Sequence, residues 1–115
     1  MAMGLRFRQE APPVATKSFP VGTTIFFPTS ALVGIQRPCI YRVSLNAAAA
    51  ATFQFQDTAN NVLSAVYSLP VNGLYILETP INGDPLWQPG APGLGLQLVV
   101  ATSTVVGDIW VGLGA

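Results

Sequence analysis

Residues 38–57 read PCIYRVSLNAAAAATFQFQD, two alternating runs on either side of an alanine stretch. In both runs apolar and polar side chains alternate with a period of two, the spacing of a β-strand that buries one face. The second run places Phe53 and Phe55 on one side and two glutamines on the other, whereas a helix would leave both aromatics poorly placed. This stretch therefore predicts two strands of an antiparallel sheet.

The first run has one face that is better suited to a core than the other. We expect the inward set to be Cys39, Tyr41, Val43 and Leu45. The outward set is then Ile40, Arg42, Ser44 and Asn46. The alanines 47–51 are too few for a stable isolated helix, so they predict a strand end or a single helical turn. Their small side chains could admit a neighbouring chain, but a tight connection is the preferred interpretation.

From residue 18 onward, short β-branched or aromatic runs are punctuated by Pro, Gly and Asn, which is typical of a small antiparallel β-sandwich. The further strands that we expect are 23–27, 62–69, 74–79, 94–102 and 105–113. Asn60 and Asn61 supply one turn, and the Asn72-Gly73 dipeptide predicts a hairpin because both residues tolerate positive φ. The last two strands are almost continuously apolar, so we expect another subunit or a long loop to cover them.

The chain length suits one domain with an appended arm. Residues 1–17 show no sustained period and combine charges with prolines: Arg6, Arg8, Glu10, Pro12, Pro13 and Lys17. They predict an extended N-terminal arm that is ordered only by lying on something else, and its excess of positive charge suits an acidic neighbour. The sandwich domain then covers residues 18–115. Residues 80–93, rich in Pro and Gly, are expected to form a surface loop.

Charge is scarce in this chain. Only 9% of residues are charged and the formal net charge is +0, against about 25% charged residues in a typical soluble domain. Part of the exterior should therefore be neutral or apolar and meet another protein. The balance argues against a nucleic-acid partner, which requires a basic stripe.

Membrane insertion is the rival explanation for a mean hydropathy of +0.49. No apolar run reaches the length of a spanning helix, and Arg6, Arg8 and Glu10 interrupt the segment where a signal peptide would be apolar. We expect no membrane partner and synthesis in a cytoplasm.

The residue types that catalysis uses most are missing. The chain has no histidine, and its only cysteine, Cys39, can form neither an internal disulfide nor a zinc cluster. The carboxylates are scattered, and each is expected to be a solvated loop or strand-edge charge: Glu10, Asp57, Glu78, Asp84 and Asp108. We therefore expect no enzyme, no cofactor and no metal site.

Trp87 is the most informative aromatic residue, because it follows Leu86 inside the Pro/Gly loop. A buried indole there requires either folding of the loop onto its own domain or insertion into a partner, and the sequence favours these two alternatives equally. A carbohydrate platform built from Trp87, Tyr75 and Trp110 is a weaker alternative. Trp110 lies in a predicted strand and is expected in the core.

The C-terminal residues carry a family resemblance. Residues 93–101, GLGLQLVVA, and residues 106–112, VGDIWVG, fit an x-Gly-x-x-Leu-x-Leu strand followed by a Val-x-Gly-x-aromatic-x-Val strand. This pattern resembles the closing strands of small β-sandwich accessory virion proteins of tailed bacteriophages. The resemblance covers about residues 62–113, and it departs from the pattern at residues 99–101, VVA, where a Ser is common.

The resemblance implies a jelly-roll-like protein that decorates or cements the phage head as part of the virion, after synthesis in the host cytoplasm. It also implies a terminal arm that grips a neighbour. The expected partners are further copies of the chain, with a trimer favoured, and the major capsid protein or another virion protein. The expected contact residues are Arg6, Phe7, Arg8, Leu86 and Trp87. The alternatives are a tail, neck or fibre component and a small module that binds a carbohydrate or cell-surface ligand.

Overall fold

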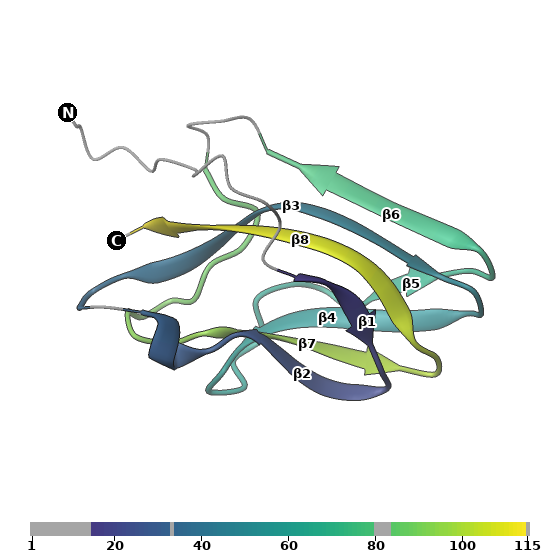
Figure 1. Cartoon of the computed structure of the whole chain (residues 1–115), viewed down its shortest axis with the longest axis horizontal. Coiled ribbons are helices and arrows are strands. Elements are labelled where there is room, and N and C mark those ends of the chain that lie inside the picture. The colour runs from purple at the N-terminus through teal and green to yellow at the C-terminus, as the bar shows by residue number, and fades with distance from the viewer. Residues whose placement is uncertain (1–14, 33, 80–83, 115) are drawn as a thin grey trace.

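The computed structural model describes residues 15–32, 34–79 and 84–114, with side chains from residue 18 onward. It is a sandwich of two antiparallel sheets (Figure 1). The elements are β1 (Ala15–Phe19), β2 (Gly22–Phe27), the 3-10 helix η1 (Thr29–Ala31), β3 (Arg37–Ala47), β4 (Ala51–Asp57), β5 (Tyr67–Leu69), β6 (Gly73–Glu78), β7 (Leu96–Ala101) and β8 (Val105–Gly114). The predicted fold class is confirmed.

The strand order is that of an eight-stranded jelly roll. One sheet runs β1-β8-β3-β6 and the other runs β2-β7-β4-β5. The pairs β1·β8, β2·β7, β3·β6 and β4·β5 are all antiparallel, so the chain is a long two-stranded ribbon rolled into two layers. β1 was not predicted as a strand, and it begins at Ala15, within the last residues assigned to the arm.

The core lies between the two sheets and is rich in aromatic rings. Phe53 and Phe55 point inward, as their alternation predicts, and their ring centroids are 6.0 Å apart. Phe26 from β2 meets Phe55 edge to face at 6.1 Å and Phe19 from β1 at 6.3 Å. Aliphatic residues from both sheets complete the cluster: Ile40, Val43, Leu45, Leu69, Leu96, Leu98, Val100, Val105 and Ile109.

A β-bulge in β3 corrects the predicted faces of that strand. The β3·β8 register shifts between Ile40 and Arg42, so side chains before the bulge change sides relative to those after it. Ile40, predicted to face outward, is fully buried in the core cluster, whereas Cys39 and Tyr41 are buried outside that cluster. Val43 and Leu45 face inward as expected.

Two predicted connections have different outcomes. The alanine stretch forms the expected tight connection, with Ala47 ending β3 and Ala51 beginning β4. Asn72 adopts a left-handed φ of 58°, and Gly73 N–H donates to Pro70 C=O at 2.8 Å, so the predicted reversal occurs. The predicted hairpin does not, because β5 and β6 belong to different sheets.

The predicted strand 62–69 is shortened to β5. Val62 forms only an isolated bridge with Gln56. The Leu63 and Ser64 N–H groups both donate to the Phe55 carbonyl, at 2.9 and 3.3 Å, and the Ser64 hydroxyl accepts from Phe55 N–H at 2.9 Å. These contacts bend the segment around one residue of β4, so a regular ladder begins only at Tyr67.

Candidate functional site

The predicted contact residues fall into two groups. Arg6, Phe7 and Arg8 lie outside the described residues. Leu86 and Trp87 are half-buried and pack against the domain's own core. Leu86 N–H donates to Ile40 C=O at 2.8 Å, and Ile40 N–H donates to Trp87 C=O at 2.9 Å. Contact of any of these five residues with a partner stays a prediction.

Trp87 is held inside its own domain. Its ring stacks on Phe55 at 4.9 Å with 24° between the planes, and it lies 6.0 Å from the Tyr67 ring. The described part of the Pro/Gly loop therefore covers an end of the core instead of standing away as a simple surface loop, and Pro89 is also buried. Of the two alternatives for Trp87, folding of the loop onto its own domain describes this contact.

Trp110 does not join the other two aromatics proposed as a carbohydrate platform, because Tyr75 and Trp87 both contact Tyr67 in one aromatic cluster. Tyr75 packs against Phe53 and Tyr67, whereas Trp87 packs against Phe55 and Tyr67. Trp110, expected in the core, instead lies half-buried on the outer side of β8, because the inward side chains of that strand are Val105 and Ile109. The Arg42 guanidinium sits 4.6 Å from the Trp110 ring centroid and covers it.

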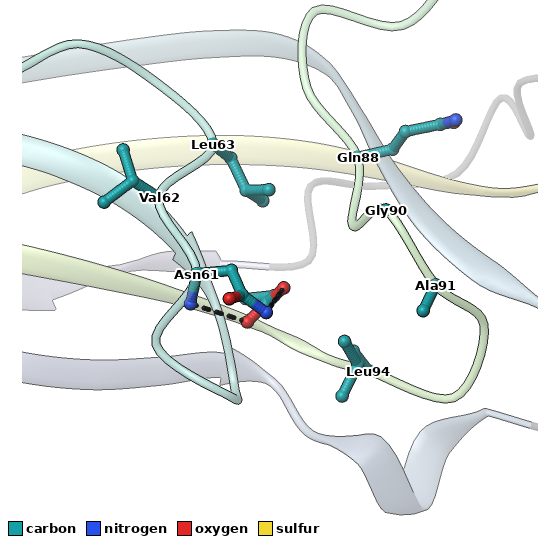
Figure 2. A pocket seen from close by; sticks show the side chains of 8 residues that line it. Asn61, Val62, Leu63, Gln88, Gly90, Ala91 and Leu94 are labelled. Atoms are coloured by element: carbon teal, nitrogen blue, oxygen red, sulfur yellow. Dashed lines mark hydrogen bonds between the residues drawn. The ribbon is translucent and has the colours of Figure 1, made fainter.

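A pocket of about 410 Å³ opens beside the Asp57 turn (Figure 2). Half of its lining residues are aliphatic, namely Val62, Leu63, Ala91 and Leu94, and the others are Asp57, Asn61, Gln88 and Gly90. Gln88 contributes little polarity to the opening, because its side-chain amide lies 3.1 Å from Cys39 Sγ.

Asp57 is 1% exposed, which corrects the expectation of a solvated charge. Its Oδ1 accepts from Ala59 N–H at 2.9 Å and Asn61 N–H at 3.0 Å, and its Oδ2 accepts from the Asn61 side-chain amide at 2.9 Å. The carboxylate closes the turn after β4, which explains its burial. It is a structural group in this pocket, and the aliphatic lining supplies no nucleophile or general base.

The titratable groups of the described residues form no candidate reactive or metal site. Within residues 15–32, 34–79 and 84–114, no three His, Cys, Asp or Glu side chains gather where they could hold a metal ion. Burial, with a smaller contribution from the neighbouring Tyr67, raises the pKa of Tyr75 to about 12. A phenol with this pKa stays neutral at physiological pH and acts as a packing group.

The outer face of the β2-β7-β4-β5 sheet carries a ladder of hydrogen-bonded amides. Gln97 Nε2 donates to Gln56 Oε1 at 3.0 Å and to Asn60 Oδ1 at 2.8 Å. Gln56 Nε2 donates to Gln54 Oε1 at 3.1 Å, and Gln54 Nε2 donates to Ser64 C=O at 3.2 Å. The chain of amides crosses from β7 to β4 and ends on the segment before β5.

We call this outer surface the amide face. The strand registers place the following residues on it: Thr23, Ile25, Thr52, Gln54, Gln56, Val62, Ser68, Gln97, Val99 and Ala101. None of them is charged. Ile25 is 53% exposed and Val62 is 60% exposed, at the two ends of the row that contains Gln97 and Gln56.

The outer surface of the other sheet, which we call the charged face, has a different composition. Register places the following residues on it: Ser18, Arg42, Ser44, Asn46, Leu74, Ile76, Glu78, Val106, Asp108 and Trp110. Three of these residues are charged, and the exposed aliphatics Leu74 and Ile76 gather on the edge strand β6. Val106 is 43% exposed, so any cover over this part of β8 must come from outside the described residues.

Comparisons with protein-family models, curated proteins and solved structures give no match to this chain. Among the described residues, no helix is long and apolar enough to cross a membrane.

Sequence reasoning identified Gln54 and Gln56 as outward residues and missed their function as a ladder. The third member, Gln97, comes from a strand that reads as continuously apolar, LQLVV, and it is 3% exposed. Its one signal is that it is the only amide in that strand. Recognising it as a bridge to Gln56 requires the β4·β7 register, which pairs these two residues.

Proposed function

We propose that this chain is a non-enzymatic structural protein of a tailed-phage virion, with decoration or cementing of the head as its role. The observation that carries the proposal is the amide face, an uncharged surface with exposed aliphatics in a molecule that has few charges of any kind. Such a surface is suited to stable burial against another protein.

A partner that covers the amide face must remove water from it. Burying a charge costs several kcal/mol unless it is paired, and burying an amide is costly mainly when its hydrogen bonds are lost. In the ladder, the Gln54, Gln56 and Gln97 amides already bond to one another or to Asn60 and Ser64. A partner can therefore cover the ladder without breaking the hydrogen bonds among these amides, while Ile25 and Val62 contribute apolar contact area.

In this proposal, cementing works through repeated contacts. Each copy adds a modest buried area, and the symmetry of the particle multiplies it. Self-association of the chain, as the expected trimer or as another closed oligomer, would arrange copies around symmetry axes of the shell. The arm residues Arg6, Phe7 and Arg8 would add a second contact with a sibling subunit or with the capsid.

The test is made on purified virions of the phage that encodes the chain. We expect the chain in stoichiometric amounts by mass spectrometry and on the head surface by antibody labelling. Heads stripped of the chain should open at a lower temperature than complete heads, and addition of the purified chain should restore the original opening temperature. Absence of the chain from the particles would refute the virion proposal, and labelling at the tail, neck or fibre would select the alternative location.

A further inference from the structure

The four edge strands of the sandwich differ in how well they are protected from pairing with other strands. Native proteins protect sheet edges with prolines, bulges, charged residues or short strands. β2 lies between Pro20 and Pro28 and has a register shift near its end, and β5 is only 3 residues long. β1 contains Lys17 and ends before Pro20.

β6 has almost none of these protections. It has no proline, its ladder with β3 runs without a register shift, and its one charged residue, Glu78, is its last. Leu74 is 60% exposed and Ile76 is 54% exposed. Figure 1 shows β6 as the outermost strand of its sheet.

Among the described strands β6 pairs only with β3, and its hydrogen bonding identifies which of its backbone groups face the other edge, the open edge. Thr79 N–H donates to Tyr41 C=O at 3.0 Å, and these residues continue the β3·β6 register. Because hydrogen-bonded and non-hydrogen-bonded pairs alternate in an antiparallel ladder, the odd-numbered residues of β6 bond to β3. The N–H and C=O groups of Leu74, Ile76 and Glu78 therefore point away from the sheet.

We propose that β6 pairs with β6 of a second copy of this chain, in antiparallel orientation about a two-fold axis. The two β1-β8-β3-β6 sheets would then form one continuous sheet across the dimer. This contact is independent of the virion proposal, because it requires only two copies of the chain.

The sequence of β6 is complementary to itself in one register. With Leu74 opposite Ile76 of the second copy, the outward backbone groups form two hydrogen-bonded pairs related by the two-fold axis. The four exposed aliphatic side chains then meet on one side of the joined sheet. On the other side Leu77 faces a glycine, Gly73, and the two copies of Tyr75 lie opposite each other at the two-fold axis. Each Glu78 lies opposite an Asn72, on the same side as the aliphatic residues, so no like charges meet.

The first experiment measures the mass of the full chain by sedimentation over a range of concentrations. We expect a monomer–dimer equilibrium that Ile76→Pro weakens by roughly ten to a hundredfold, because proline removes the edge N–H in both copies. Proline is tolerated there because that N–H makes no bond to β3. Ile76→Thr is the matched control, since it keeps the N–H and a β-branched side chain and should weaken the dimer less.

Hydrogen exchange supplies a readout that does not depend on a variant. The amide protons of Leu74 and Ile76 should become protected as the concentration rises, whereas those of Tyr75 and Leu77 should be protected at every concentration. A wild-type chain that stays monomeric, or an oligomer that Ile76→Pro leaves unchanged, would overturn the proposal. Binding of such a monomer to virions would still support the proposed function, so the two failures are distinguishable.

A pair of double variants tests the register. Leu74→Lys/Ile76→Lys places like charges opposite each other and should abolish the dimer. Leu74→Lys/Ile76→Glu loses the same aliphatic contacts but places opposite charges together, so it should dimerise at least tenfold more tightly than the first variant. Equal affinities of the two variants would refute this register. Circular dichroism and thermal unfolding confirm that each variant is folded.

Discussion

The two outer faces of the sandwich use polar residues in opposite ways. On the amide face, Gln54, Gln56 and Gln97 are neutral and bond to one another. On the charged face, Arg42 covers Trp110, with Glu78 and Asp108 on neighbouring strands. The same sheet geometry thus presents one surface that is inexpensive to dehydrate and one that carries charged side chains.

This difference separates two kinds of contact. A broad partner surface fits the amide face, since no charge has to be buried there. The charged face is suited to contact at its margin, where Leu74 and Ile76 lie beside the open edge of β6. A molecule with both features can contact a shell and a sibling copy at the same time.

The largest effect should come from distorting the sheet beneath the charged face. Gly107 in β8 has a φ of 151°, and a Cβ added there would collide with the Ser44 carbonyl oxygen and approach Leu45 Cα. Gly107→Ala should lower the free energy of unfolding by about 3 kcal/mol or more. Gly90→Ala is the control because its Cβ would meet open space, and urea denaturation of both variants gives the comparison. Similar stabilities would contradict the tight β3·β8 contact.

The second prediction compares the loss of stability when one polar residue on each face is replaced by alanine. Gln97→Ala removes a 3% exposed side chain that donates to Gln56 and Asn60, so it should lower the free energy of unfolding by about 2 kcal/mol. Arg42→Ala removes a half-exposed cation from the Trp110 ring and should cost about 1 kcal/mol. Chemical denaturation measures both variants, and the reverse order would show that the ladder contributes little.

The sequence predicted the strands more successfully than their partners. The two strands within residues 38–57, the terminal strands and the reversal at Asn72-Gly73 are local properties, and the structure confirms them. The pairing partner of β6 is β3, which is far away in the chain, so the local turn signal wrongly indicated a hairpin. Strand order depends on which faces bury together, and a single sequence does not contain that directly.

The candidate surfaces also depend on strand pairing, which the sequence did not predict. A bulge changed the side to which Ile40 points, and Trp110 was assigned to the core on hydrophobicity although its neighbour Ile109 takes that side. The amide face and the open edge of β6 arise from registers between strands, as in the bond from Gln97 to Gln56. Only the scarcity of charge, which indicated a surface meeting another protein, was visible without the fold.

The third prediction tests which face would bind the phage head under the proposed function. Ile25→Lys adds a charge to the exposed margin of the amide face and should weaken binding to stripped phage heads at least tenfold, or about 1.4 kcal/mol. Val106→Lys is the matched control on the charged face, where the added charge should have little effect. Unfolding free energies should change by less than about 0.5 kcal/mol in both variants, since both positions are exposed. Equal loss of binding would remove the distinction between the faces.

The smallest effect tests the seam where the two sheets meet. Tyr75 on β6 lies 5.3 Å from the ring of Phe53 on β4 and 5.0 Å from that of Tyr67 on β5, and burial raises the pKa of Tyr75 to about 12 from an ordinary value of 10.0. At a pH between these two pKa values, Tyr75 keeps its proton in the folded chain and loses it in the unfolded chain. The contribution of the Tyr75 proton to the free energy of unfolding is therefore complete below pH 10, and it is lost as the pH rises toward 12.

Tyr75→Phe removes this titration and keeps the ring. Its unfolding free energy should fall less steeply with pH than that of the wild-type chain above pH 10, and the two slopes should agree near neutral pH. Denaturation at a series of pH values measures the difference, from which the other ionisable groups cancel because they are shared. Parallel curves up to pH 12 would place Tyr75 in water, and the two sheets would then meet less closely at β5 and β6 than on the rest of the sandwich.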